Sequence, residues 1–245
     1  MISTIISYCS LDRRFLRPNL AQASKFSSEV IIVCYERLLS GKEEPAGHFE
    51  ALAALTGPRV IILPWDETKS ARFHHNQARW VGAAFAREPW LLFLDADEIV
   101  EGENFRRFMD LEQSFEFDAA TFSCFWYFRE PIYQSLKLEN AGLLLRRSKV
   151  TPELSFSQAE RWGYWQSKDI RAPQPLVLSS GPVLHHFSWV RTQAEMLEKV
   201  ASWAHKNDRD WTSLVNEEFR HEFSGTDFIH GYQFRRTGNP FSIEL

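Results

Sequence analysis

The order of apolar and amphipathic segments in the first hundred residues constrains the fold more than any other feature of this chain. Four short apolar runs alternate there with three amphipathic stretches. The runs are residues 2–7, 30–34, 60–63 and 90–94, and the stretches are residues 15–26, 47–55 and 73–85. Strands that alternate with helices form a mostly parallel, Rossmann-like sheet with helices on both faces. In such α/β sheets ligands bind beyond the carboxyl ends of the strands, where the strand order reverses.

The second half of the chain is predicted to be mixed and to carry the C-terminal helices. We expect a short helix at residues 105–111, strands at residues 119–128, 142–146 and 182–187, and a proline-rich, loop-rich segment at residues 151–181. Thr192 and Glu195 have the spacing of a capping box, and the apolar positions Met196, Val200 and Trp203 that follow predict an amphipathic helix. Because there is no obvious linker, we expect one compact domain.

A cluster of acidic residues ends the fourth apolar run, in the stretch WLLFLDADEIV. Asp95 and Asp97 are one residue apart at the predicted strand end, so both face the same opening and form a hard oxygen site for Mg²⁺ or Mn²⁺. The alternative is an acidic turn whose carboxylates cap a following helix.

Charge and cysteine content exclude several classes of function. The 28 basic and 32 acidic residues give a net charge of −4, which argues against nucleic-acid binding over the whole surface. No apolar run approaches the roughly 20 residues of a membrane span. Cys9, Cys34 and Cys124 are far apart and form no CxxC motif, as expected for core residues in a reducing compartment. We therefore expect a cytoplasmic protein without transmembrane segments, and peripheral association with a membrane stays open.

Two stretches resemble the family 2-like group of glycosyltransferases with the GT-A fold. The first is NQARWVGAAFAREPWLLFLDADEIV, residues 76–100, and the second is ISTIISYCSLDRRFLRPNLAQASKFSSEVIIV, residues 2–33. The resemblance covers residues 1–110 and implies that Asp95 and Asp97 hold a divalent cation, which in turn holds the diphosphate of a nucleotide sugar. Residues 1–110 would then bind the nucleotide sugar, and residues 111–245 would bind a glycan or other hydroxyl acceptor.

Donor binding requires further residues around the strand ends. Many members of the family carry an acidic residue after the second strand to bind the base, whereas this chain has Cys34-Tyr35-Glu36, so that either Tyr35 or Glu36 could serve. Cations must also neutralise the negative charge that develops on a leaving diphosphate. The candidates for donor binding are Ser7, Tyr35, Glu36, Arg72, Arg79, Asp95, Arg191 and Lys199, with His205 as a further cation.

A pair of histidines follows in LHHFSWVR, residues 184–191. Neutral imidazole is a better ligand for Mn²⁺ than for Mg²⁺. The stretch resembles an aromatic-rich His-x-x-Trp-Val-Arg segment found late in bacterial family 2-like members, and His186 matches its histidine. His185 would face the other way on a strand. The predicted metal ligands are therefore Asp95, Asp97 and His186.

An inverting transferase, the mode that we expect, needs a carboxylate that accepts the proton of the attacking hydroxyl. Glu160 is the first candidate because it lies in the loop-rich segment expected over the acceptor, and Asp169 and Glu130 are the others. Trp162, Tyr164 and Trp165 could stack on sugar faces or form a small core of their own.

Two other classes of function remain in view. A nucleotidyltransferase shares the sheet and the metal-bound carboxylates but usually has a glycine-rich loop after the first strand, and SYCSLDRRF has no glycine. A noncatalytic sugar- or nucleotide-binding module fits the aromatic content but leaves the acidic strand end without a task. The residues do not indicate which sugar, nucleotide or acceptor is used.

Overall fold

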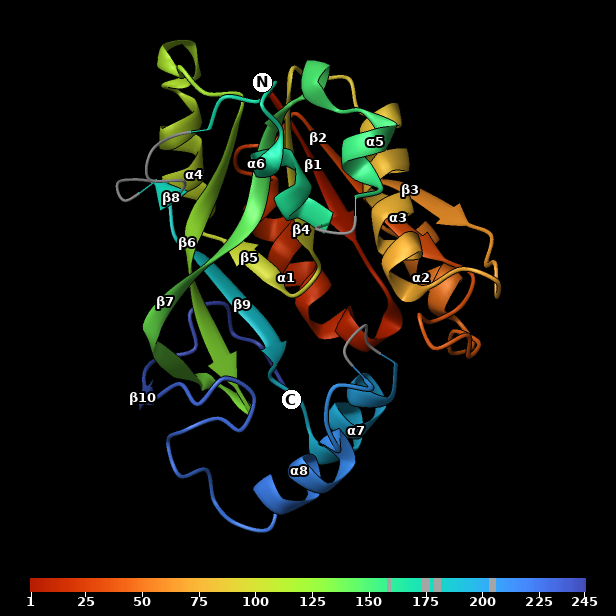
Figure 1. Cartoon of the computed structure of the whole chain (residues 1–245), viewed down its shortest axis with the longest axis vertical. Helices are drawn as coiled ribbons and strands as arrows, with labels where there is room; N and C mark the ends of the chain where they lie inside the picture. The colour runs from red at the N-terminus through yellow and green to blue at the C-terminus, as the bar shows by residue number, and fades with distance from the viewer. Residues whose placement is uncertain (158–159, 173–176, 179–181, 203–205) are drawn as a thin grey trace.

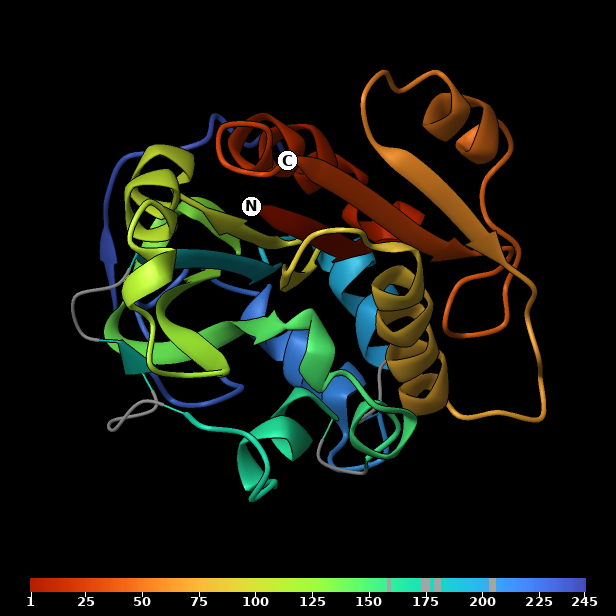
Figure 2. The ribbon, with the colours of Figure 1, turned by 90° about the horizontal axis from the view of Figure 1, so that it is seen from above.

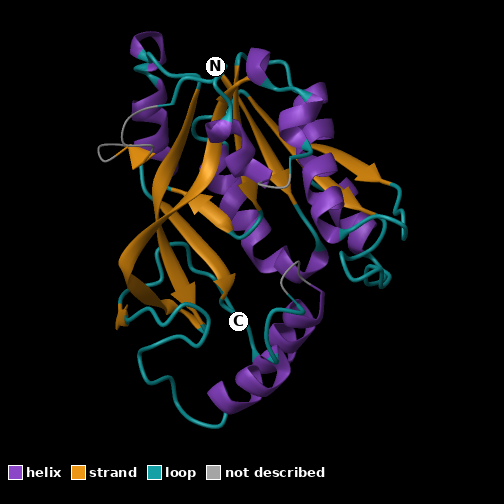
Figure 3. Ribbon diagram, in the orientation of Figure 1, coloured by secondary structure: helices purple, strands orange, loops and turns teal. Residues whose placement is uncertain are grey.

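The strands of the computed structural model, which describes residues 1–157, 160–172, 177–178, 182–202 and 206–245, form one curled sheet. Figure 3 shows this sheet along the length of the molecule. The described strands are β1 (Ile2–Ser7), β2 (Glu29–Tyr35), β3 (Arg59–Leu63), β4 (Trp90–Asp95), β5 (Glu98–Val100), β6 (Ala119–Phe128), β7 (Glu130–Arg146), β8 (Val177–Leu178), β9 (Leu184–Trp189) and β10 (Phe234–Arg236). Their order is β3-β2-β1-β4-β7-β6-β9-β5, and β10 and β8 pair with β7 and β6 respectively.

Helices cover both faces of the N-terminal part of the sheet. The described helices are α1 (Arg13–Ala23), α2 (His48–Ala53), α3 (Ala71–Phe85), α4 (Gly102–Met109), α5 (Pro152–Ser155), α6 (Gly163–Gln166), α7 (Gln193–Ser202) and α8 (Trp211–Glu218), with 3-10 turns η1 (Ser10–Asp12), η2 (Glu112–Ser114), η3 (Arg147–Lys149) and η4 (Glu160–Trp162). Figure 2 shows α1 and α2 on one face and α3 on the other. The predicted α/β fold is confirmed.

The reversal of strand order falls between β1 and β4. The chain runs outward from β1 through β2 to β3 and then returns to the other side of β1 as β4, and all four strands are parallel. Ser7, the last residue of β1, is the register partner of Asp95, the last residue of β4. The acidic stretch therefore lies where this class of sheet binds its ligands.

The C-terminal part of the sheet is mixed, as expected. β7 is antiparallel to β4 and to β6, whereas β9 runs parallel to β6 and antiparallel to β5. The strand predicted at residues 142–146 is the end of the longer β7, because its earlier residues pair with β6 and β10. Polar side chains interrupt that earlier part, and this hides it from a search for apolar runs.

Close packing brings α3 onto the sheet near the strand ends. Gly82 lies over β1, where an added Cβ would stand 2.4 Å from Cγ2 of the buried Ile5. A larger side chain at this position would push the helix away from the strand. Arg79, one turn earlier on the same helix, is itself buried at the carboxyl end of the sheet.

Helix α7 begins with the predicted capping box. The backbone N–H of Thr192 donates to Oε2 of Glu195 at 2.9 Å, and the N–H of Glu195 donates back to the hydroxyl of Thr192 at 3.4 Å. Met196 and Val200 are buried as expected, whereas Trp203 lies outside the described residues. Figure 1 shows α7 beyond the carboxyl ends of β1 and β4. Among the described residues, no helix is both long enough and apolar enough to cross a membrane.

Candidate functional site

The acidic stretch forms a tight connection between β4 and β5. Asn19 of α1 is buried beneath it and donates from Nδ2 to the carbonyl oxygens of Ala96, at 3.1 Å, and Glu98, at 2.9 Å. The next helix, α4, begins only after β5, and the backbone N–H of its first residue, Gly102, donates to Oε1 of Gln22 at 3.0 Å and to none of these carboxylates. The alternative in which these carboxylates cap a helix is therefore wrong.

A pocket of roughly 360 Å³ lies over the carboxyl ends of β1 and β4. Six of the predicted donor-binding residues line it besides Asp95, namely Ser7, Tyr35, Arg72, Arg79, Arg191 and Lys199. Asp97, His186 and Glu160 line the same pocket. The hydroxyl of Ser7 is buried there without a hydrogen-bond partner among the described residues.

Asp95 faces two arginines. Its Oδ1 accepts a hydrogen bond of 3.0 Å from Nη2 of Arg79, and its Oδ2 lies 3.5 Å from Nη2 of Arg161. Burial would raise the pKa of Asp95, but the two guanidinium groups more than offset it and hold the pKa far below its usual value. Asp95 is therefore ionised at neutral pH.

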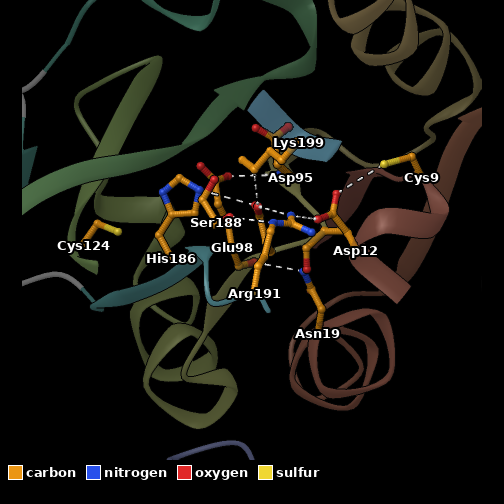
Figure 4. Close-up of polar contacts among 12 residues, drawn as sticks. Cys9, Asp12, Asn19, Asp95, Glu98, Cys124, His186, Ser188, Arg191 and Lys199 are labelled. Atoms are coloured by element: carbon orange, nitrogen blue, oxygen red, sulfur yellow. Dashed lines mark hydrogen bonds and ion pairs between the residues drawn. The ribbon is translucent and has the colours of Figure 1, made fainter. Parts of the chain in front are cut away.

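Asp97 faces a second group of cations. Its Oδ1 lies 3.4 Å from Nε2 of His186, and its Oδ2 lies 3.8 Å from Nζ of Lys199 and 3.9 Å from Nη2 of Arg191. Figure 4 shows these three basic side chains around the end of the strand. Burial opposes ionisation of Asp97, yet His186 and Lys199 hold its pKa well below the usual range. The carboxylate of Asp97 in turn raises the pKa of His186 despite the burial of the imidazole.

The chemistry of the predicted metal ligands suits a divalent cation. Two carboxylates and an imidazole are a donor set that Mn²⁺ accepts. Asp97 and His186 already lie together, whereas Asp95 is turned toward its arginines. Within the described part of the chain, no three His, Cys, Asp or Glu side chains are gathered closely enough to hold a metal. The donor types fit, and two of the three predicted ligands, Asp97 and His186, lie close together.

Arg191 is more deeply buried than a surface cation would be. Its side chain is 1% exposed and pairs with Asp12 of η1. It also donates to the carbonyl oxygens of Leu11, at 2.7 Å, and Ser188, at 2.9 Å. As Figure 4 shows, this arginine joins the residues after β1 to those after β9. Most of its donors are therefore committed to the protein itself.

Glu160 lies between two of the predicted donor-binding arginines. Its Oε1 is 3.5 Å from Nε of Arg72, and its Oε2 is 3.4 Å from Nη1 of Arg79. The backbone of Glu160 has a φ of 52°, a left-handed conformation that is uncommon for a residue with a side chain. Such strain persists where the surrounding structure imposes it, often at functional sites.

The other candidates from the sequence, Glu36, Glu130 and Asp169, do not line the pocket. Glu36 is exposed and lies beside Arg37 and Trp65 in a neighbouring hollow. Glu130 begins β7 as an exposed residue, and Asp169 accepts a hydrogen bond from Lys149 through its backbone carbonyl. None of the three lines the pocket, so the geometry favours Glu160 and Tyr35 over them.

The aromatic residues after Glu160 also lie outside the lining of the pocket. Tyr164 is buried and hydrogen-bonds Ser155 through its hydroxyl, while Trp165 packs on the core and Trp162 packs on Trp165. These contacts support the small-core alternative. His185 points away from the pocket toward Tyr127, whereas His205 lies outside the described residues.

Sequence reasoning missed several polar residues of the pocket, among them Arg161 and Asp12. Arg161 follows the candidate Glu160 directly but was hidden among the aromatic residues of that segment, and its partner Glu98 is 63 positions away. Asp12 was hidden because it begins the first helical stretch like an ordinary capping residue, although it pairs with Arg191. A search for charged residues beside the named candidates would have found Arg161.

Comparison with known proteins identifies the fold of this chain but does not assign it to a family. No protein-family model and no curated protein matches the chain. Among solved structures, residues 1–349 of TarS from S. aureus, in complex with UDP, are 13% identical, with a TM-score of 0.50 over 90% of this chain and 72% of that one. The inositol-1-phosphate CTP transferase from T. maritima is 10% identical, with a TM-score of 0.48 over 88% of this chain and 96% of that one. At these identities the likeness to TarS shows a shared fold alone.

Proposed function

We propose that this protein is a glycosyltransferase that moves a sugar from a nucleotide-diphosphate donor to a hydroxyl acceptor, with inversion. One observation carries the proposal. The pocket at the reversal of strand order combines ionised carboxylates at the end of β4 with arginines and a lysine on facing elements. The similar TarS structure holds UDP, which supports a nucleotide as the ligand of this fold.

The side chains of the pocket can be assigned to the steps of transfer. Glu160 accepts the proton of the acceptor hydroxyl as its oxygen bonds to the anomeric carbon. The bond between that carbon and the phosphate oxygen breaks, and the nucleoside diphosphate leaves with the electron pair. Arg79 and Lys199 stabilise the charge that develops on the diphosphate. Ser7 offers a free hydroxyl for a hydrogen bond to the donor.

We further propose that the site uses Mn²⁺ or Mg²⁺. Asp97 and His186 would hold the metal, and Asp95 would complete the set. A divalent cation bound there neutralises phosphate oxygens as a Lewis acid. His186 must be neutral to act as a ligand.

The activity is tested with nucleotide sugars in the presence of Mn²⁺. The first step is a thermal-shift panel of nucleoside diphosphates with and without the metal, because a ligand of the native state raises the apparent stability. Release of nucleoside diphosphate from the matching nucleotide sugar supports the proposal. Release of pyrophosphate from a nucleoside triphosphate and a sugar phosphate would instead establish nucleotidyl transfer, and binding without either reaction would establish a binding module.

A further inference from the structure

A two-bond ion pair at the pocket joins two residues to which the proposed reaction gives no role. Glu98 is completely buried, and both of its carboxylate oxygens accept from Arg161. The distances are 2.6 Å from Nη1 to Oε2 and 2.7 Å from Nη2 to Oε1. Two parallel bonds of this kind fix the orientation of both partners as well as their separation.

This bridge joins two parts of the chain that meet at the pocket. Glu98 also accepts a bond of 3.0 Å from the backbone N–H of Asp95, so its carboxylate is fixed to the end of β4. Arg161 belongs to η4 and lies 3.5 Å from Oδ2 of Asp95 on the same side. The bridge therefore ties the segment of residues 160–166 to the strand that carries the acidic residues.

The segment of residues 160–166 packs closely against the residues before it, and its first residue, Glu160, has a strained backbone conformation. Glu160 directly precedes Arg161 and has the left-handed φ of 52°. Gly163 lies so near Ser157 that an added Cβ would stand 2.0 Å from its Oγ. Bonds from the rest of the protein must hold Glu160 in a conformation that it would not adopt alone. The bridge is the shortest polar link of this segment to the sheet.

We propose that Arg161 is a positioning residue, whose bridge to Glu98 holds the carboxylate of Glu160 over the end of β4 for proton transfer. The inference rests on the proposed function, because the role of Glu160 as base is part of it. Lysine cannot replace the arginine here, since its ammonium group is a point charge without the planar fork. A displacement of about 1 Å at a reacting group is enough to lower turnover on the order of 10²-fold.

The test compares Arg161→Lys with Arg171→Lys. Arg171 also pairs with a buried carboxylate, that of Asp118, and it does not line the pocket. In Arg161→Lys we expect kcat to fall on the order of 10²-fold, with little change in the KM for the donor. Amide hydrogen exchange of residues 160–166 should become faster in the same variant. Arg171→Lys should change neither quantity, and Glu98→Gln should reproduce the effects of Arg161→Lys.

Other results would overturn the inference. A raised donor KM with an unchanged kcat would make Arg161 a donor-binding residue. An unchanged rate of exchange would show that the bridge does not anchor the segment. If the wild type transfers no sugar from any donor, the proposed function is wrong, and the exchange rates alone then decide whether Arg161 holds residues 160–166 in place.

Discussion

The charges of the pocket are matched residue by residue. Asp95 pairs with Arg79 and Arg161, while Asp97 pairs with His186 and Lys199. Each carboxylate therefore has its own set of cations, and a substitution at one can be studied without changing the other's partners. The predictions for Asp97 and His186 use this separation.

Asp97→Asn should abolish Mn²⁺-dependent binding of a nucleotide sugar and leave the fold intact. The neutral amide keeps the shape of the carboxylate but loses the charge that a divalent cation requires. Calorimetric titration measures the binding, and circular dichroism checks the fold. Asp110→Asn, at the exposed C-cap of α4, is the control. Unchanged metal-dependent affinity would remove Asp97 from the site.

His186→Ala should weaken Mn²⁺ binding more than Mg²⁺ binding, because imidazole prefers the softer ion. His185→Ala should leave both affinities unchanged. It should instead lower the free energy of unfolding by about 1–3 kcal/mol, since the buried hydroxyl of Tyr127 loses His185, one of its two partners, and keeps only the bond that Gln134 donates to it. Metal titrations and urea unfolding of both variants measure these effects. Equal losses of the two metals in His186→Ala would contradict the assignment.

Glu160→Gln should lower transfer by about 10² to 10⁴-fold, the usual contribution of a positioned base. Donor affinity should not weaken, because glutamine removes a negative charge from between two donor-binding arginines. Kinetics and donor titration separate the two effects, with Glu153→Gln on exposed α5 as the control. Asp169→Asn and Glu130→Gln should keep near-normal turnover, and a large loss in either would move the role of base away from Glu160.

Sequence patterns located the parts of the site that lie on strand ends. The Asp-x-Asp spacing at a predicted strand end indicates Asp97, whereas His186 was chosen through the family resemblance, and the alternation of faces in a strand separates it from His185. The partners of Glu98 and Asp12 could not be predicted in this way. Their contacts join residues 63 and 179 positions apart, and no local spacing reports such a distance.

At the scale of elements, the N-terminal strands were predictable because each is an apolar run with clear ends. The predicted strands at residues 2–7 and 119–128 have the observed bounds. The first part of β7 was missed, since a strand that is half exposed carries polar residues. β5 was missed because three residues are too few to show a hydrophobic pattern, although this strand carries Glu98 beside the pocket.

The contact between α3 and β1 leads to a prediction about stability. Gly82→Ala should lower the free energy of unfolding by about 1–3 kcal/mol, because the added Cβ meets a buried isoleucine in a packed core. Urea unfolding measures the change. Gly238→Ala is the control, since nothing lies within 4 Å of the added atom there. Equal stability of Gly82→Ala and the wild type would mean that the helix can move away from the strand at no cost.

At the scale of the whole molecule, one buried carboxylate joins segments far apart in the sequence. The side chain of Asp118, the residue before β6, is 4% exposed and lies near Arg146, Lys149 and Arg171. Burial would raise its pKa, but the bonds from Arg171 and the charge of Lys149 lower it below the usual value. Its ionised form therefore stabilises the folded chain.

The contribution of Asp118 to the stability of the fold therefore depends on pH. A carboxyl group with a lowered pKa in the folded state contributes fully to stability above its unfolded pKa of about 3.9, and the contribution is lost as the pH falls through the folded value. The difference in melting temperature between wild type and Asp118→Asn should therefore shrink when the pH is lowered toward this range. Thermal unfolding across acidic pH measures it, and a difference that grows on acidification would refute the assignment.

The position of Glu160 between Arg72 and Arg79 also affects how quickly the proposed transferase would release its product. A pocket whose basic side chains had no carboxylate partner would retain a nucleoside diphosphate long after transfer. Here the carboxylate of Glu160 can pair with both arginines once the phosphates have left. Each cycle would then end with an exchange of one anion for another, and product inhibition should be weaker than the number of arginines suggests.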